Sequence, residues 1–307
     1  MNRIAGIIVA VIGLLVAVLS IAKVIPSLTV TGVCLILLGG LVIGLSFIGK
    51  PDTEGTERMS TPSTLANIFF APSEVFSNLR RHPRWLVAAI IMAVLSSVYL
   101  NVFIHRLTPE RVANYAIDKT LEMPMLNDQA REQIEKGRAT AIEQNKNPVL
   151  RTGQAVNSFV GEVFLYAFLG LVFFLFALAM GGKINYWQAF AVAVYAFFPV
   201  TVIRQILNLI LLFIKDPADI HPILGQRSLV QDNLNFLVAP SEHPVIFVLL
   251  GWISILWLYW IILNAMGLKN AGERVSSTAA WAATLTMWVV GLLISLLFAM
   301  IFPSFLS

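Results

Sequence analysis

The sequence predicts an all-α fold, a polytopic membrane helical bundle with seven transmembrane helices. Its 307 residues are 58% hydrophobic and only 12% charged, with a mean hydropathy of +0.80. A soluble domain is closer to half apolar and a quarter charged. Several runs exceed the ~18 apolar residues that a membrane-spanning helix needs. These runs are continuous rather than alternating, which favours helices over a closed barrel as the way to satisfy the backbone in lipid.

Residues 1–49 are predicted to form an N-terminal transmembrane hairpin. The apolar run 4–22 is followed by a second apolar run, 28–48, after only five residues. So short a connection favours two antiparallel helices joined by a tight turn at Lys23–Ser27, through Pro26.

Two motifs in this hairpin leave alternatives open. Ser20-Ile-Ala22 has the small-x-small pattern of a signal-peptidase site, so the first run can also be read as a signal peptide. Gly40-x-x-x-Gly44 has the spacing that lets membrane helices approach closely. It indicates either a dimer face or glycines without such a role.

Cys34 is the only cysteine, which excludes an internal disulfide and a cysteine metal cluster.

Residues 50–63 are polar and contain glycine and proline, which predicts a linker before a second domain, 64–307. That domain begins with a segment, 64–82, that is too short and too polar to span a membrane. We expect an interfacial helix whose basic end contacts lipid headgroups through Arg80, Arg81 and Arg84. A cytoplasmic cap packed under the bundle explains the same pattern.

The third span is predicted at 85–105 and leads into the largest polar region, 106–154. Thr108-Pro109 and Asn127-Asp128 are typical helix starts, so this region should be helical. Its eight basic and seven acidic residues nearly cancel. Mixed charge of this kind favours a solvated extracytoplasmic insert over a binding surface.

The fourth and fifth spans, 157–180 and 186–214, flank a turn at Gly181-Gly182-Lys183 and contain two charged residues, Glu162 and Arg204. At 1.5 Å per residue, Glu162 lies roughly 8 Å and Arg204 roughly 15 Å from the outer helix ends. An unpaired intramembrane charge costs about 2.5–3.5 kcal/mol. We therefore expect the two side chains to form an ion pair.

Other polar residues are predicted at similar depth and would complete a polar layer: Asn157, Gln205 and Asn208. Two interpretations are open, because the layer can either clamp the hairpin or line a site for a lipid headgroup, an ion or a proton. Pro199 removes the hydrogen bond to the Tyr195 carbonyl, so it should kink the fifth span.

A second polar loop, 215–243, precedes the sixth and seventh spans, 244–265 and 279–302. Its acidic and histidine residues match no zinc or calcium spacing; they are Asp216, Asp219, His221, Asp232, Glu242 and His243. The chain also lacks the common catalytic and phosphate-binding motifs. We expect no catalytic residue, no cofactor and no metal, and the absence of a basic-aromatic patch argues against nucleic acid.

The distribution of basic residues predicts the orientation. With a cytoplasmic N-terminus, nine basic residues lie inside and eleven outside, eight of them in 106–154. The positive-inside rule holds best for short loops. Without that long loop the count is nine against three, which favours a cytoplasmic N-terminus and an extracytoplasmic C-terminus.

The order of several motifs makes residues 60–303 resemble a bacterial protein of the Yip1-domain family. The motifs are IFFAPSEVF at 68–76, HPRW at 82–85, GGK at 181–183, YAFFP at 195–199 and a closing pair of spans from Trp257. The resemblance implies a five-helix domain with a cytoplasmic N-terminal side and an opposite C-terminus. Eukaryotic relatives are implicated in membrane traffic and small-GTPase binding. No GTPase-contact motif is identifiable in this chain, so that function is not carried over.

These observations predict a non-enzymatic integral membrane protein, a membrane-organising or protein-interaction module of the bacterial inner (cytoplasmic) membrane. The expected partners are membrane lipids, together with protein partners or a second copy of the chain held through small-residue faces. The alternative is a transporter or channel for a small solute, ion or lipid that uses the polar layer around Glu162 and Arg204. A lipid-acting enzyme would require His221, His243 and acidic residues to converge over a cleft.

Overall fold

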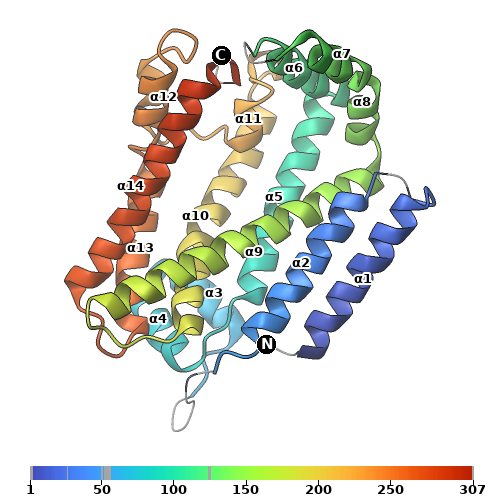
Figure 1. Cartoon of the computed structure of the whole chain (residues 1–307). Helices are drawn as coiled ribbons and strands as arrows, with labels where there is room; N and C mark the ends of the chain where they lie inside the picture. The colour runs from blue at the N-terminus through green and yellow to red at the C-terminus, as the bar shows by residue number, and fades with distance from the viewer. Residues whose placement is uncertain (1–2, 26, 50, 52–56, 124–125, 306–307) are drawn as a thin grey trace. The chain divides into compact units, whose positions relative to one another are not determined.

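The computed structural model describes residues 3–25, 27–49, 51, 57–123 and 126–305, and this part of the chain is built from helices (Figure 1). The α-helices are α1 (Arg3–Ile21), α2 (Thr29–Leu45), α3 (Thr61–Phe70), α4 (Pro72–Arg81), α5 (Leu86–Leu107), α6 (Pro109–Leu121), α7 (Asp128–Lys136), α8 (Arg138–Lys146), α9 (Pro148–Ala179), α10 (Tyr186–Ile214), α11 (Leu224–Arg227), α12 (Pro244–Gly251), α13 (Ile255–Ala271) and α14 (Ser277–Ile301). Outside helices, the described residues form one isolated β-bridge, between Asn233 and Ser254. The predicted all-α class is confirmed.

Five helices of the described part of the chain are long and apolar enough to cross a membrane: α1, α5, α9, α10 and α14. They correspond to five of the seven predicted spans. The predicted second span, 28–48, is the shorter helix α2 of 17 residues. The count of seven spans is therefore not confirmed, although the chain is a multi-pass helical membrane protein.

The predicted sixth span, 244–265, is wrong as one continuous helix, because α12 ends at Gly251 and α13 begins at Ile255. Asp232, a polar residue outside the predicted span, stabilises this break. The Asp232 backbone carbonyl accepts from the Ile255 N–H at 3.0 Å, and its carboxylate accepts from the Leu256 N–H at 3.0 Å and from the Ser254 hydroxyl. Asp232 thus satisfies the free N–H groups at the start of α13.

The chain divides into two compact units. Unit 1 comprises 1–93, 148–198 and 264–283, and unit 2 comprises 94–147, 199–263 and 284–307. The boundary within α10 falls between Phe198 and Pro199, and α10 is assigned as one helix through this proline. Three features stay predictions: the proline kink, the domain boundaries at 49 and 63, and the linker 50–63. The described residues do not include Pro26, Lys50 or residues 52–56.

In unit 1, α1 and α2 form an antiparallel hairpin and lie side by side (Figure 1). Their backbones approach so closely that a Cβ atom on Gly32 would lie 2.5 Å from the Ala17 nitrogen. The Ser20 hydroxyl fixes the turn by accepting from the Leu28 N–H at 3.0 Å. By contrast, nothing lies within 4 Å of the Cβ positions of Gly40 and Gly44. Their predicted role as a dimer face stays a prediction.

The segment 64–82, predicted as one helix, forms parts of α3 and α4, which are separated at Ala71. Pro72 begins α4 because its ring suits the first turn of a helix and cannot continue α3. The apolar face of α4 is fully buried in unit 1 through Val75, Phe76 and Leu79. This burial favours the alternative of a packed cap, while contact with a membrane surface stays a prediction.

The polar insert of unit 2 begins as the sequence predicts. Thr108 caps α6 by accepting from the Arg111 N–H, and Asn127 caps α7 by accepting from the Ala130 N–H. Gly137 separates α7 from α8. Charged residues of opposite sign pair with one another across these helices, as in Lys146–Glu110 at 2.6 Å. The Lys146 hydrogen bond holds the pKa of the exposed Glu110 carboxyl below its usual value.

Candidate functional site

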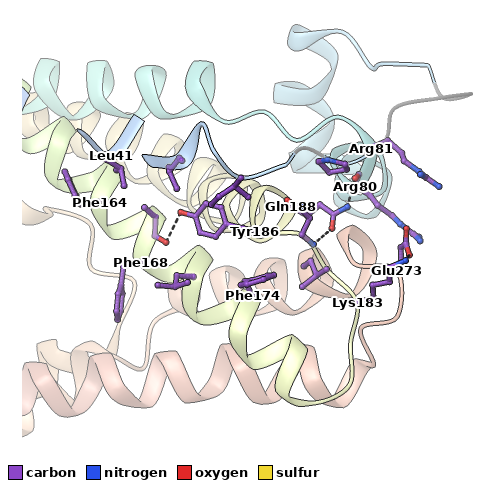
Figure 2. Close-up of a pocket in the computed structure, with 17 residues that line it drawn as sticks. Leu41, Arg80, Arg81, Phe164, Phe168, Phe174, Lys183, Tyr186, Gln188 and Glu273 are labelled. Carbon is purple, nitrogen blue, oxygen red and sulfur yellow. Dashed lines mark hydrogen bonds and ion pairs between the residues drawn. The ribbon is translucent and has the colours of Figure 1, made fainter. Parts of the chain in front are cut away.

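A pocket of about 780 Å³ lies in unit 1, and every residue that lines it belongs to that unit (Figure 2). One end is apolar and the other is charged. Figure 2 shows Leu41, Phe164 and Phe168 toward one end and Arg80, Arg81, Lys183 and Glu273 gathered at the other. The pocket therefore has the amphipathic character of a lipid rather than that of a polar metabolite.

The apolar part of the pocket, which we call the apolar slot, is lined by two helices. The first wall is formed by Leu41 and Leu45 at the C-terminal end of α2 and by Ile48 just after it, and the second by Phe164, Ala167, Phe168, Leu171 and Phe174 on α9. The α9 stripe runs from Phe164 to Phe174, ten residue steps or roughly 15 Å at 1.5 Å per step. Tyr186 also lines the slot, and its hydroxyl donates to the Ala167 carbonyl at 3.2 Å, so the phenol presents mainly its ring.

The charged part, which we call the basic end, contains Arg80, Arg81, Lys183 and Glu273. The Lys183 ammonium lies 2.9 Å from the Glu273 carboxylate, and the Glu273 N–H donates to the Lys183 carbonyl at 2.8 Å. The Lys183 hydrogen bond and charge, together with the nearby Arg80 and Arg81, hold the pKa of Glu273 below its usual value. Three cations thus act on one carboxylate.

The start of α10 positions the basic end. Asn185 and Gln188 form a capping box: the Asn185 side chain accepts from the Trp187 N–H at 2.9 Å, and the Gln188 side chain accepts from the Asn185 N–H at 2.7 Å. The Gln188 amide then donates to the Arg80 carbonyl at 2.7 Å. This bond ties the last turn of α4 to the first turn of α10.

The connection after α2 is fixed against the same helix start. The Trp187 indole N–H donates to the Ile48 carbonyl at 3.1 Å, and the Asn185 amide donates to the Gly49 carbonyl at 3.0 Å. At the other side of the basic end, Gly181 takes φ +76°, which favours glycine, and turns the chain from α9 toward Lys183. The predicted Gly181-Gly182-Lys183 turn is confirmed.

The three arginines predicted to contact headgroups have different surroundings. Arg80 and Arg81 are half-buried and line the basic end, and the Arg80 Nε atom is buried without a hydrogen-bond partner among the described residues. Arg84 instead donates to the Met59 carbonyl and to the Thr64 hydroxyl. Burial lowers the pKa of the Arg84 guanidinium. Its headgroup contact stays a prediction, but two of its contacts are made within unit 1.

Two residues of the predicted polar layer form a hydrogen-bonded chain in unit 2. The fully buried Asn208 accepts from the N–H groups of Leu229 and Val230 at 2.8 and 3.1 Å. Its amide donates to Gln205 at 3.2 Å, and the Gln205 amide donates to the Ser96 hydroxyl at 3.2 Å. Asn208 therefore holds the loop that follows α11.

The other predicted polar residues lie on α9 and α10. Glu162 and Asn157 belong to unit 1, and one carboxylate oxygen of Glu162 and the Asn157 amide oxygen are buried without a hydrogen-bond partner among the described residues. Arg204 belongs to unit 2. The Glu162–Arg204 ion pair stays a prediction.

The apolar slot and two residues of the basic end, Lys183 and Glu273, were not predicted from the sequence. Every position of α9 near the slot is apolar or aromatic, so periodicity alone cannot separate a pocket wall from a lipid-facing surface. Lys183 and Glu273 are 90 residues apart in the chain, and folding brings them together. The Asn185-x-x-Gln188 pattern was a usable signal, because it is a helix-start motif.

Among the described residues that line the pocket, Glu273 is the one carboxylate, and none is a serine, threonine, cysteine or histidine. These residues provide no nucleophile beside a general base.

The model of the Yip1 domain matches residues 66–300 of the chain. No curated protein and no solved structure matches the chain.

Proposed function

The chain belongs to the Yip1 family, and from this premise we propose that it is a non-enzymatic membrane-organising module that binds a membrane lipid. The apolar slot of unit 1 is the observation that carries the proposal. Its volume of about 780 Å³ lies within the range of small-molecule sites, ~300–1,000 Å³.

A hydrocarbon chain is the occupant that the walls of the slot accept most readily. Leucine and phenylalanine side chains from α2 and α9 supply apolar contact over roughly 15 Å. A polar solute would lose its hydration there without gaining hydrogen bonds, at a cost of about 1–3 kcal/mol for each unpaired group. An acyl chain loses nothing of this kind.

We place the protein in the bacterial inner membrane with a cytoplasmic N-terminus and an extracytoplasmic C-terminus. This orientation puts Arg80, Arg81 and Lys183 on the cytoplasmic side, as the positive-inside rule favours. Association of two copies through Gly40 and Gly44 is compatible with the proposal, because both glycines face open space.

The test is purification in a mild detergent, followed by native mass spectrometry of the bound lipid. Leu171 lines the slot and is 44% exposed, so Leu171→Trp should fill the slot without overpacking a core. Leu175, one turn further along α9 and 53% exposed, does not line the slot and gives the matched control, Leu175→Trp. We expect lipid adducts on the wild type and on Leu175→Trp, and their loss from Leu171→Trp. Equal adducts on both variants would overturn the proposal.

A second candidate function is transport or conduction through the polar layer around Glu162 and Arg204. The buried, unpartnered oxygens of Glu162 and Asn157 favour it, since an intramembrane ionisable residue often marks a pathway. Proteoliposomes carrying a pH-sensitive dye would test it for protons. Flux that Glu162→Gln abolishes would support transport, whereas flux equal to that of empty liposomes would reject proton conduction.

A further inference from the structure

We propose that the ligand of unit 1 is an acidic phospholipid, whose phosphate binds Arg80, Arg81 and Lys183 while one acyl chain fills the apolar slot. The inference rests on the proposed function and adds the headgroup. It converts a general lipid pocket into one that selects lipids by charge.

The charge balance of the basic end carries the first step. Arg80, Arg81 and Lys183 provide three positive charges, and Glu273 is the one carboxylate among the described residues that line the pocket. Glu273 is already engaged by Lys183 at 2.9 Å. Two positive charges are therefore left over, so an anion is attracted to this end and an ammonium group is repelled.

The basic side chains of this end differ in how accessible they are to a phosphate. Arg80 and Arg81 are half-buried and line the basic end. The Lys183 side chain is 72% exposed, so its ammonium can contact Glu273 and a phosphate together. Arginine and lysine are the side chains that commonly bind phosphate oxygens.

The arrangement of the two parts identifies the source of the phosphate as a lipid. Charge is confined to one end, and the slot beyond it is apolar for roughly 15 Å along α9. A free phosphate would leave the slot empty. An acidic peptide would place its backbone N–H and carbonyl groups in the slot, where leucine and phenylalanine cannot hydrogen-bond them.

The proposed orientation agrees with this headgroup. It places the basic end at the cytoplasmic leaflet, where anionic lipids attract basic residues by about 1 kcal/mol for each lysine or arginine. That figure corresponds to about fivefold in binding for each cation. The two positive charges left over therefore give a preference of about 25-fold over a zwitterionic lipid.

The test measures lipid preference in nanodiscs that contain equal amounts of phosphatidylglycerol and phosphatidylcholine. Native mass spectrometry of the ejected protein gives the ratio of the two lipids bound. We expect wild type to favour phosphatidylglycerol, and Arg80→Gln/Arg81→Gln to lower the ratio about 25-fold, or about fivefold for each cation. Lys183→Gln should lower it about fivefold, and its exposed side chain makes this variant safe for folding.

The matched control removes two cations of unit 1 that do not line the pocket, Lys269 and Arg274. Lys269→Gln/Arg274→Gln should leave the ratio unchanged. An equal fall in the control would show that general surface charge sets the preference, and no fall in any variant would likewise overturn the inference. Lipid bound by the wild type without a headgroup preference would overturn it too, and would leave the proposed function intact. Lipid that persists in Leu171→Trp would instead overturn the proposed function.

Discussion

The basic end of the pocket in unit 1 and the Gln205–Asn208 chain in unit 2 are both clusters of polar residues next to apolar helices, yet they differ in what remains available. Asn208 donates to Gln205, and its oxygen accepts two backbone N–H groups within the same unit. At the basic end, the described part of the chain places three cations beside a single carboxylate. A polar group whose hydrogen-bonding capacity is used within the chain stabilises the fold. A cluster whose charge is not neutralised within the chain can instead bind a ligand.

The largest expected effect tests the stabilising side of this comparison. Asn208→Ala would leave the buried Leu229 N–H without its acceptor, and the half-buried Val230 N–H would keep only the Ser228 hydroxyl at 3.1 Å. At about 1–3 kcal/mol for the unpaired Leu229 N–H and about 1 kcal/mol for the hydrogen bond lost at Val230, the free energy of unfolding should fall by about 2–4 kcal/mol. Thermal unfolding in detergent, together with proteolysis of the 215–243 loop, would measure the loss.

Gln205→Leu is the control, because it removes the bonds to Ser96 and Asn208 but leaves both backbone N–H groups paired. We expect it to cost about 1–2 kcal/mol, because two ordinary hydrogen bonds are lost. If Asn208→Ala is no worse than Gln205→Leu, the Asn208 contacts with the loop contribute nothing.

The α1–α2 hairpin offers the same comparison in apolar packing. Gly32 is in contact with Ala17, whereas Gly40 on the same helix faces open space. Gly32→Ala should destabilise the hairpin by about 1–3 kcal/mol, as overpacking does, because the new Cβ would force the two backbones apart. Gly40→Ala should be neutral or slightly stabilising in a helix interior. Thermal unfolding of the two variants checks this, and equal losses would contradict the packing of the hairpin.

The sequence predicts most of the helices because hydropathy and helix-start residues are local signals. The Thr108 and Asn127 caps and the long apolar helices follow from neighbouring residues alone. The break between α12 and α13 does not, because its cap is Asp232, more than twenty residues earlier in the chain. Continuous hydropathy therefore predicts one span where a distant carboxylate allows two helices.

The site divides in the same way. Arg80 and Arg81 were predicted to contact headgroups because they end an amphipathic segment, and they line the basic end of the pocket. Lys183 and Glu273 come from two separate loops, and no sequence pattern links them. The sequence does not identify the walls of the slot, because a lipid-facing residue and a pocket-lining residue are both apolar.

The Glu273 carboxylate competes with a lipid phosphate for Lys183, so its removal should have a small effect on the lipid preference. Glu273→Gln should raise the preference for phosphatidylglycerol about fivefold, since one opposing charge is removed. Glu74→Gln is the charge-matched control, since Glu74 is an exposed carboxylate of α4 that does not line the pocket. A gain in both variants would mean that net charge alone sets the preference.

The pH dependence of this gain follows from the pKa of Glu273, which Lys183, Arg80 and Arg81 hold below its usual value of 4.5. The carboxylate stays ionised while the pH falls from about 7 to about 5, so the ratio between the Gln variant and wild type should be constant there. Below the usual range the wild-type carboxyl is protonated and the two proteins should converge. The stabilising effect of the Lys183–Glu273 pair has the same sign: it is fully present above the unfolded pKa and is lost as the pH falls through the lowered folded value. Lipid ratios measured in nanodiscs at several pH values check this, and convergence already near pH 6 would show that Glu273 is not held by the three cations.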